Sequence, residues 1–164
     1  MTTDTTSVAN PAIQFVAAHE KTVKVVPGRR DWVEYRDFGV AGGTNGRMRA
    51  ERGTVNGKPE LTGWHYHECE MQFFYLLNGS ITLELENGET VVLERGDSAL
   101  IPGGFRHSET AVSEDFDFIE ISIPGDMGTV PCSAPDIWRE KFHRSCVRGY
   151  DSLRSERWRR GATR

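Results

Sequence analysis

The chain has 164 residues, of which 37% are apolar, and its formal net charge is −4. This length supports one domain with a well-buried core but not two. The charge is uneven, because the segment from Arg139 to the last residue holds nine Lys or Arg against three Asp or Glu. The main body is therefore acidic, which argues against a nucleic-acid-binding surface on it.

The sequence shows no sign of a membrane segment or of export. No apolar run approaches the roughly 20 residues that a membrane-spanning helix needs, and the polar first residues lack the basic and apolar regions of a signal peptide. The cysteines Cys69, Cys132 and Cys146 are odd in number and show no CxxC spacing, which is typical of free thiols in a reducing compartment. We therefore expect a cytoplasmic protein.

Short strands are predicted along most of the chain. Residues 1–22 are expected to form an N-terminal arm that is partly disordered, and within it residues 11–19 favour either a short helix or an irregular segment. Strands are predicted over residues 23–26 and 32–38, then, after a loop at 42–46, over 47–55, 64–67, 71–77, 80–86, 90–93, 98–101, 105–112 and 116–123. The Asn-Gly pairs at 56–57, 78–79 and 87–88 indicate hairpin turns.

Strands of this length and spacing are typical of an antiparallel sandwich or barrel. We therefore predict an all-β domain over residues 23–135, a jelly-roll β-barrel of two facing antiparallel sheets. Residues 136–164 are predicted to begin with a short helix capped by Asp136 and to continue as an Arg-rich extension that contacts the acidic body. The N-terminal arm or a second subunit is expected to cover the exposed strand edges.

The segment Trp64-His65-Tyr66-His67 carries the clearest chemical signal. Two histidines at positions i and i+2 of a strand point to the same face, and neutral imidazole is a common ligand of transition metals. His107 follows the Gly-rich turn at 102–104, and Gln72 lies on the strand after His67. Because barrel interiors bring distant strands together, His65, His67, Gln72 and His107 are predicted to form one metal site. A single histidine would be better explained as a packed core residue.

This spacing resembles the cupin superfamily. His65, His67, Gln72 and Gly79 match its first motif, which has H-x-H, then three or four residues, Glu, six residues and Gly. Gly96, Pro102, Gly104 and His107 match its second motif, G-x5-P-x-G-x2-H-x3-N. The chain departs from the motifs at three positions, where Pro59 replaces the opening Gly, Gln72 replaces Glu, and Ala111 replaces the final Asn.

The resemblance implies a metal-dependent protein that acts on a small molecule and forms a homodimer. It also implies one divalent transition metal ion, and His and amide ligands suit Fe, Mn, Ni and Zn alike. In cupins a basic residue on the strand before the first motif often meets an anionic substrate, which points to Arg47 and Arg49. The alternative for both arginines is a solvated strand face.

Strand alternation predicts further pocket residues. Phe74 and Leu76 share the face of Gln72, and Phe105 shares the face of His107, so these three residues are predicted to bind substrate. Glu109 and Glu120 fall on inward faces by the same rule. Both carboxylates are predicted to be catalytic, as general bases or as groups that orient a ligand histidine. For Glu109 a salt bridge at the barrel mouth is an equal alternative.

The neutral amide of Gln72 leaves more positive charge on a bound metal than a glutamate would, which favours anionic substrates. A neutral ligand fits both oxygen-dependent and redox-neutral chemistry, but the apolar pocket residues favour a dioxygenase that acts on an enolisable or aromatic substrate. One alternative is a redox-neutral isomerase or lyase of sugar acids or keto acids. Another is a ligand-binding protein without catalysis. Neither nucleic acid nor a membrane is expected as a partner.

Overall fold

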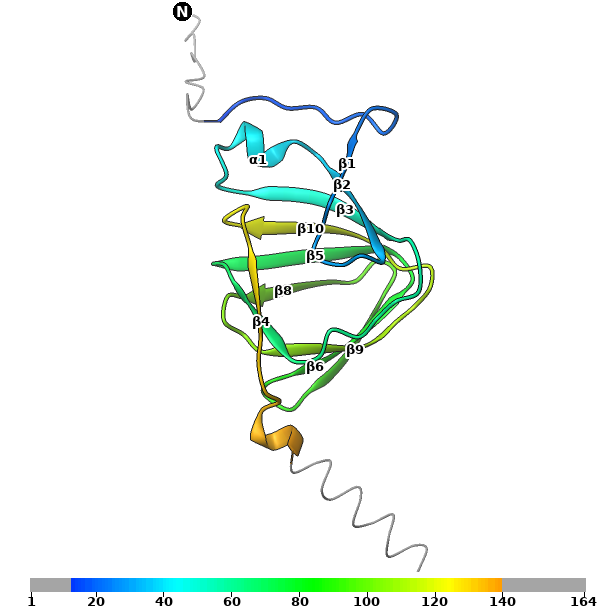
Figure 1. Cartoon of the computed structure of the whole chain (residues 1–164), viewed down its shortest axis with the longest axis vertical. Helices are drawn as coiled ribbons and strands as arrows, with labels where there is room; N and C mark the ends of the chain where they lie inside the picture. The colour runs from blue at the N-terminus through cyan, green and yellow to red at the C-terminus, as the bar shows by residue number, and fades with distance from the viewer. Residues whose placement is uncertain (1–12, 140–164) are drawn as a thin grey trace, which may run out of the picture.

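The computed structural model describes residues 13–139, and in them eleven strands form two facing antiparallel sheets (Figure 1). The first sheet has the order β1 (Lys24–Val26), β2 (Val33–Asp37), β3 (Arg49–Val55), β10 (Asp117–Ile123), β5 (Met71–Asn78) and β8 (Ser98–Pro102). The second has the order β11 (Gly128–Pro131), β4 (His65–Glu68), β9 (His107–Val112), β6 (Ser80–Leu85) and β7 (Thr90–Glu94). The predicted all-β jelly roll is confirmed.

Three local features differ from the expectation. The short helix α1 (Val40–Gly43) forms where a loop was predicted to begin. The strand β11 was not predicted, because its four residues show no usable alternation; it forms by pairing along the whole length of β4. Phe105 precedes β9 instead of lying in it. Residues 13–18 are irregular, so the described part of the N-terminal segment is an arm and not a helix.

A turn of helix begins at residue 136, and Trp138 within it is buried and packs on Trp64 with 5.8 Å between ring centroids. Residues 1–12, Cys146 and the Arg-rich extension beyond 139, for which predictions were made above, lie outside the described residues. No helix within residues 13–139 combines the length and apolar character needed to cross a membrane.

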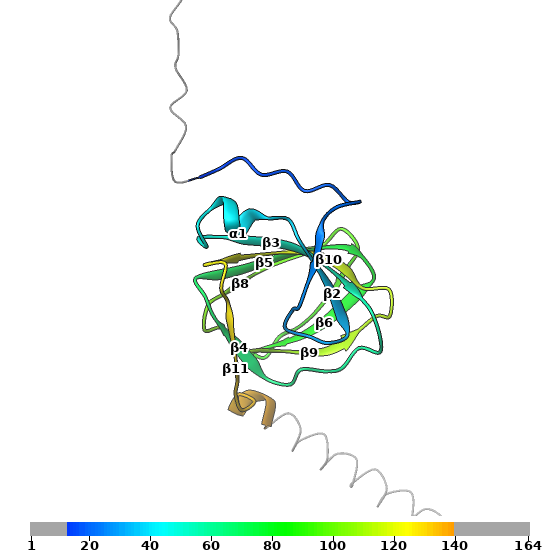
Figure 2. The same ribbon diagram turned by 45° about the horizontal axis from the view of Figure 1, so that its top comes forward.

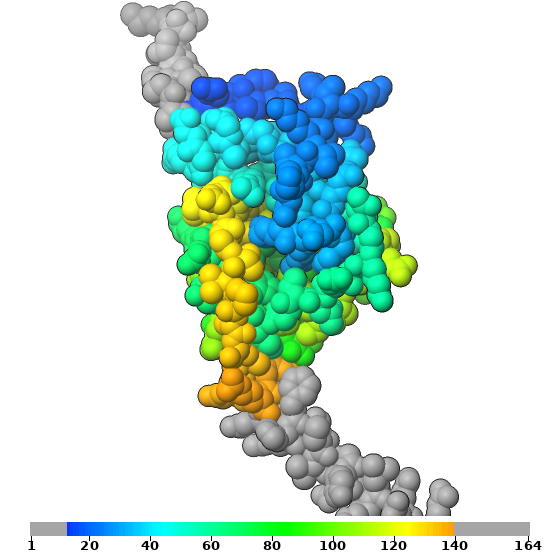
Figure 3. Space-filling view, in the orientation of Figure 1, coloured from blue at the N-terminus to red at the C-terminus, as the bar shows by residue number. Residues whose placement is uncertain are grey.

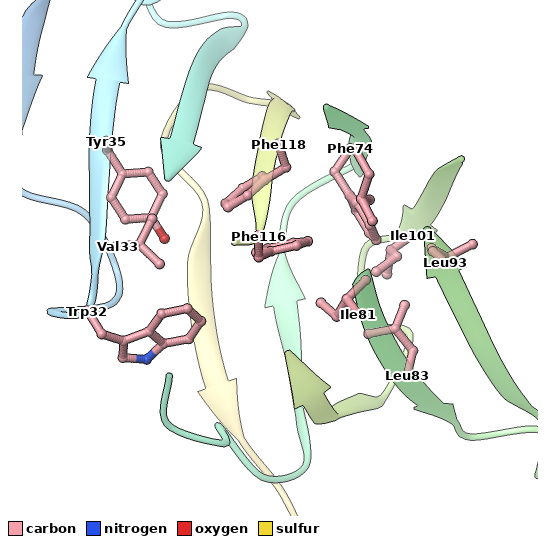
Figure 4. Packing of buried hydrophobic residues seen from close by; sticks show 11 residues of the cluster. Trp32, Val33, Tyr35, Phe74, Ile81, Leu83, Leu93, Ile101, Phe116 and Phe118 are labelled. Atoms are coloured by element: carbon pink, nitrogen blue, oxygen red, sulfur yellow. The ribbon is translucent and has the colours of Figure 1, made fainter. Parts of the chain in front are cut away.

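The core fills the space between the two sheets. The rings of Phe116 and Phe118 stack with centroids 4.8 Å apart, and Tyr35 meets Phe118 edge-on at 6.4 Å. Figure 4 shows these rings between Tyr35 on one side and the aliphatic residues of β6, including Ile81, on the other. Figure 2 shows how the two sheets surround this interior. The remaining interior space, next to β4 and β9, is where the polar residues of the site gather.

Candidate metal centre

Three histidines converge on the inner face of the second sheet. His65 on β4 pairs directly with His107 on the neighbouring strand β9, and His67 lies two residues along β4 on the same face. All three side chains are buried, and one ring nitrogen of each lies within 4.8 Å of those of the other two. The predicted convergence of these three side chains is therefore present in the structure.

Backbone carbonyl groups orient each imidazole. Nδ1 of His65 lies 2.9 Å from the carbonyl oxygen of Gly63, and Nδ1 of His107 lies 3.0 Å from that of Phe105. Nδ1 of His67 lies 3.3 Å from the carbonyl oxygen of Gly128. A carbonyl oxygen only accepts, so the neutral rings of His65 and His107 carry the proton on Nδ1 and keep a free lone pair on Nε2. Nδ1 of His67 also lies 3.1 Å from the Thr129 hydroxyl, which can donate or accept. With Nδ1 engaged by these groups, Nε2 of each ring is left for a metal ion.

Burial favours the uncharged form of His67 and His107. Burial and the positive charge of Arg29 lower the pKa of His67 to about 4. Burial also lowers the pKa of His107, although its hydrogen bond to the carbonyl of Phe105 acts in the opposite direction. Because metal binding needs the unprotonated ring, both shifts favour a metal-binding state near neutral pH.

Gln72 reaches the interior from the facing sheet. It lies on β5, is 6% exposed, and lines the same enclosed cavity as His107. Its Nε2 donates to Glu120 Oε2 at 2.7 Å, whereas its Oε1 is buried with no hydrogen-bond partner among the described residues. A buried amide oxygen without a partner is uncommon and costly, and a bound cation would satisfy it.

The turns that carry the two motifs are locked together. The backbone N–H of Gly103 donates to the carbonyl of Glu70 at 3.0 Å, and that of Gly104 donates to the carbonyl of His67 at 3.0 Å. A Cβ atom at Gly103 would lie 1.6 Å from the carbonyl oxygen of Cys69, so only glycine fits. This contact fixes β4 and β5 relative to the turn that leads into β9.

Glu109 lies beside the histidines as a buried, ionised carboxylate. Its Oε2 is 3.8 Å from Nε2 of His65, it pairs with Arg30, and it accepts a hydrogen bond from the Thr62 hydroxyl. Burial alone would raise the pKa of Glu109, but Arg30, His65 and the Thr62 hydroxyl together lower it to about 2. The side chain therefore points into the site and also makes a salt bridge.

Glu120 is buried on β10 and makes three hydrogen bonds. Nη2 of Arg29 donates to both carboxylate oxygens, at 2.8 and 2.7 Å, and Gln72 donates to Oε2. Burial opposes ionisation of Glu120, but the charge and hydrogen bonds of Arg29 and the hydrogen bond from Gln72 keep its pKa below the usual value. Both carboxylate oxygens of Glu120 are thus hydrogen-bonded, one of them to the amide of Gln72.

Arg29 and Arg30 were not predicted. They lie between β1 and β2, a segment that the sequence presents only as a turn beginning at Pro27 and Gly28. Their ion pairs span 91 and 79 residues of sequence, so no local pattern could identify them. The blue segment that includes β1 lies over the barrel beside the yellow and orange chain of β11 in Figure 3. The only feature of the sequence that could have drawn attention to this turn is the pair of adjacent arginines.

Two cavities adjoin the histidines. The enclosed cavity measures about 20 Å³ and has room for about one water molecule. It is lined by apolar side chains together with the polar residues Arg29, Arg30, Tyr35, Gln72, His107, Glu109 and Glu120. The outer cavity measures about 290 Å³. It is lined by Arg29, Arg30, Thr62, His65, His67, Met127 and Thr129. Only the outer cavity has the size of a ligand pocket.

The predicted substrate-binding residues lie in different places. Phe74 lines the enclosed cavity, Leu76 is fully buried in the core, and Phe105 is half-buried against the core. Arg47 is exposed and lines a separate cavity of about 450 Å³ that includes none of the three histidines, and Arg49 is half-buried on β3, opposite Ser122.

Tyr35 is a further polar residue of the site that was not predicted. Its hydroxyl is buried, has no hydrogen-bond partner among the described residues, and belongs to a side chain that lines the enclosed cavity. Burial raises the pKa of Tyr35 to about 12, so the phenol keeps its proton. On sequence evidence alone this tyrosine reads as an ordinary core residue of a strand.

The residues present fit a divalent transition metal ion. The three histidines offer free Nε2 lone pairs, and the partnerless Oε1 of Gln72 is a suitable fourth donor. Three nitrogens and an amide oxygen suit several ions, so the donor set does not select one metal. The group of histidines is therefore one that can hold a metal ion.

Comparison with known proteins gives the same fold and a family match over part of the chain. Residues 53–123 match the family Cupin_2, described as a cupin domain. The uncharacterized protein YdbB of Bacillus subtilis (strain 168) is 39% identical over 44 residues, which is 27% of this chain, and the match spans 39% of the relative's length.

Solved structures with the same fold include the polyketide cyclase RemF from Streptomyces resistomycificus, with a TM-score of 0.56, 21% identity and coverage of 74% of this chain and 90% of that one. KdgF from Halomonas sp. has a TM-score of 0.52 and 20% identity, covering 68% and 94% of the two chains. At these identities the likeness concerns the fold. The family match covers residues 53–123, and the jelly-roll topology and the cluster of three histidines in this part of the chain agree with it.

Proposed function

We propose that this protein is a metal-dependent enzyme that carries out redox-neutral chemistry, an isomerisation or a lyase reaction, on a small anionic keto or hydroxy acid. The observation that carries the proposal is the outer cavity, in which His65 and His67 lie beside Arg29 and Arg30. A substrate carboxylate in this cavity would meet two guanidinium groups next to the histidines.

The two arginines retain donors for such a carboxylate. In each, only Nη2 is engaged, with Glu120 for Arg29 and with Glu109 for Arg30. Their Nε and Nη1 groups have no hydrogen-bond partner among the described residues, and a guanidinium carries five N–H donors. In this proposal Arg29 and Arg30, in place of Arg47 and Arg49, hold the substrate, because only they share a cavity with the histidines.

Glu109 supplies the proton transfer in this proposal. It is ionised at neutral pH, and its Oε2 lies 3.8 Å from Nε2 of His65. Each carboxylate oxygen has two lone pairs, so Glu109 can accept a proton from the carbon next to a substrate carbonyl while it keeps its pair with Arg30. A bound divalent metal would polarise that carbonyl and so acidify the same proton.

A dioxygenase is the second candidate, and one observation favours it. The enclosed cavity beside His107 has the size of a water or a diatomic molecule, and Phe74, Phe116 and Phe118 line it together with the charged side chains of the site. The same small volume disfavours an aromatic substrate inside the barrel. An aromatic substrate of this enzyme would have to lie in the outer cavity, where Arg29 and Arg30 suit a small acid better.

The metal is tested first. Protein purified without chelators is expected to contain about one transition-metal ion per chain by elemental analysis, and His67→Ala is expected to lose it. Metal-free wild type from such a preparation, which also fails to bind added Zn²⁺, Mn²⁺, Fe²⁺ or Ni²⁺, would remove the basis of the proposal.

Turnover then separates the candidate reactions. Metal-loaded protein is incubated in D₂O with a panel of keto acids, hydroxy acids, sugar acids, diketones and phenols, while NMR and an oxygen electrode are read in parallel. We expect deuterium incorporation or product formation from an acid without oxygen uptake. Oxygen uptake coupled to product would support the dioxygenase instead. Tight binding of an acid with neither signal would support a non-catalytic binding protein.

A homodimer is proposed on the basis of the outer face of the first sheet. Phe73 on β5 pairs with Leu100 on β8 and with Ile121 on β10, and all three point away from the interior. Leu100 is 58% exposed and Tyr75, also on this face, is 39% exposed. Since β8 is the edge of its sheet, a second copy could cover both the edge and the apolar face.

A cytoplasmic location is proposed from the cysteines. Cys69 and Cys132 are both free thiols in the described chain. Free thiols persist in reducing compartments. Labelling of intact and lysed cells with a thiol reagent that does not cross membranes would test this assignment.

A further inference from the structure

The amide of Gln72 has its two ends in different surroundings. Its Nε2 donates to Oε2 of Glu120 at 2.7 Å, and its Oε1 is buried without a partner. The side chain is 6% exposed, and Glu120 is 4% exposed. Water therefore has little access to this pair, and protein groups alone decide which way the amide faces.

Glu120 leaves the amide only one orientation. An ionised carboxylate is an acceptor with no proton to donate, so it pairs with the NH₂ end of an amide and repels the oxygen end. Turning the amide by half a rotation would place two acceptors in contact and leave two N–H donors unpaired. Oε1 of Gln72 must then face the other way, into the cavity that it shares with His107.

Arg29 keeps Glu120 in this role. Its Nη2 bonds to both carboxylate oxygens, at 2.8 and 2.7 Å, so the carboxylate can neither rotate nor move away. The arginine also balances the charge of Glu120. Glu120 is therefore a paired carboxylate that holds the uncharged amide of Gln72, and both residues line the cavity that includes His107.

We propose that Glu120 is a positioning residue that fixes the amide of Gln72 with its oxygen toward the three histidines, so that Gln72 and Glu120 act as one metal-binding unit. The inference rests on the metal site of the proposed function. It also accounts for Gln at a position where the cupin motif has Glu, because a carboxylate at position 72 would meet Glu120 acceptor to acceptor.

The test is a double-mutant cycle on metal affinity. Zn²⁺ dissociation constants are measured by chelator competition for wild type, Glu120→Gln, Gln72→Leu and the double variant. We expect Glu120→Gln to weaken Zn²⁺ binding by about tenfold or more, the usual effect of losing a group that orients a ligand. In the Gln72→Leu background the same change should have no further effect, because the amide that Glu120 orients is gone.

Two results would overturn the inference. If Glu120→Gln weakens binding by the same factor in both backgrounds, Glu120 acts through its charge and not through Gln72. If Gln72→Leu binds Zn²⁺ as tightly as wild type, Gln72 is not a ligand. Both results require that wild type binds metal, whereas failure of the proposed function would appear as wild type that binds none.

A second pair of variants guards against misfolding. Glu120→Gln leaves Arg29 without its carboxylate, which can destabilise the chain for unrelated reasons. The combination Glu120→Gln with Arg29→Gln removes the ion pair as a unit and is tested with and without Gln72→Leu. The same dependence on Gln72 is expected, and circular dichroism of each variant verifies the fold before titration.

Discussion

At the scale of single residues, the buried carboxylates of this barrel differ in whether they have an arginine partner. Glu109 and Glu120 each have an arginine partner, whereas Glu51 lies opposite Glu120 across the pairing of β3 with β10. Burial and the neighbouring charge of Glu120 raise the pKa of Glu51 to about 6, although Arg49 acts against the shift. Glu51 is therefore a buried acid whose ionisation weakens the fold.

Replacing Glu51 by Gln is expected to stabilise the protein at high pH. The pKa of Glu51 in the folded state, about 6, exceeds its ordinary value of 4.5, so its stabilising effect is present below pH 4.5 and is lost as the pH rises through 6. Glu51→Gln should thus raise the free energy of unfolding by about 2 kcal/mol at pH 8 and by much less at pH 5. Urea denaturation at both values measures this.

Glu34→Gln is the matched control, because Glu34 is a partly exposed residue of β2 that pairs with Arg36 near the surface. Its effect should stay within about 0.5 kcal/mol at both pH values. A Glu51→Gln variant that is equally stable at pH 5 and pH 8 relative to wild type would contradict the assignment of a raised pKa.

His67 affects stability at low pH, whereas Glu51 affects it at high pH. Its pKa in the folded state, about 4, lies below the ordinary 6.5, so its stabilising effect is complete above pH 6.5 and is lost as the pH falls through 4. In chelator-treated protein we expect protonation of His67 to lower the free energy of unfolding by on the order of 3 kcal/mol as the pH falls from above 6.5 to below 4. His67→Gln should show a shallower pH dependence of unfolding, and parallel curves would disprove the shift.

At the scale of elements, the site depends on two turns that touch. The turn between β4 and β5 sets the distance from His67 to Gln72, and the turn between β8 and β9 leads to His107. Two backbone hydrogen bonds and the absence of a Cβ atom at Gly103 hold these turns together. The ligands of both motifs are therefore placed by one backbone contact.

Gly103→Ala is expected to damage both the fold and the metal site. The added Cβ would lie 1.6 Å from the carbonyl oxygen of Cys69, which forces the turns apart. We expect a loss of about 3 kcal/mol in the free energy of unfolding and weaker Zn²⁺ binding. Gly42→Ala is the control, because nothing lies within 4 Å of a Cβ atom there. It should change stability by no more than about 1 kcal/mol. Equal effects of the two substitutions would exclude the proposed contact.

At the scale of the whole molecule, the first sheet presents an apolar outer face that ends at an unpaired edge. The exposed residues Tyr75 and Leu100 lie on this face near β8, whereas the interior face of the same strands is filled by the core. Such a face is typical of an interface between subunits. In the proposed homodimer this face forms the interface between the subunits.

Leu100→Glu is expected to convert a dimer into a monomer, because a charge buried in an apolar interface without a partner is costly. Sedimentation velocity at several protein concentrations measures the result. Val92→Glu is the matched control, since Val92 is 57% exposed, close to the 58% of Leu100, but lies on β7 of the other sheet. A wild-type protein that sediments as a monomer at all concentrations, or equal effects of both variants, would contradict the proposed interface.

Strand alternation, Asn-Gly turns and the spacing of His65, His67 and His107 are local properties, and by themselves they determined the all-β class, the fold family and the three inward histidines. The side-chain period of a strand is two, so residues two apart share a face whatever the rest of the chain does. The inward positions of Gln72 and Glu109 followed from the same rule. These features needed no knowledge of distant contacts.

Only the tertiary structure decided which groups meet those histidines. The ion pairs of Arg29 and Arg30 with Glu120 and Glu109 link residues far apart in sequence, and the turn that carries the arginines has no pattern that points inward. Strand β11 forms because β4 offers an edge, and the carbonyl groups that orient the histidine rings belong to the folded backbone. Cavity volumes depend on how the rings of the core pack, which strand parity does not determine.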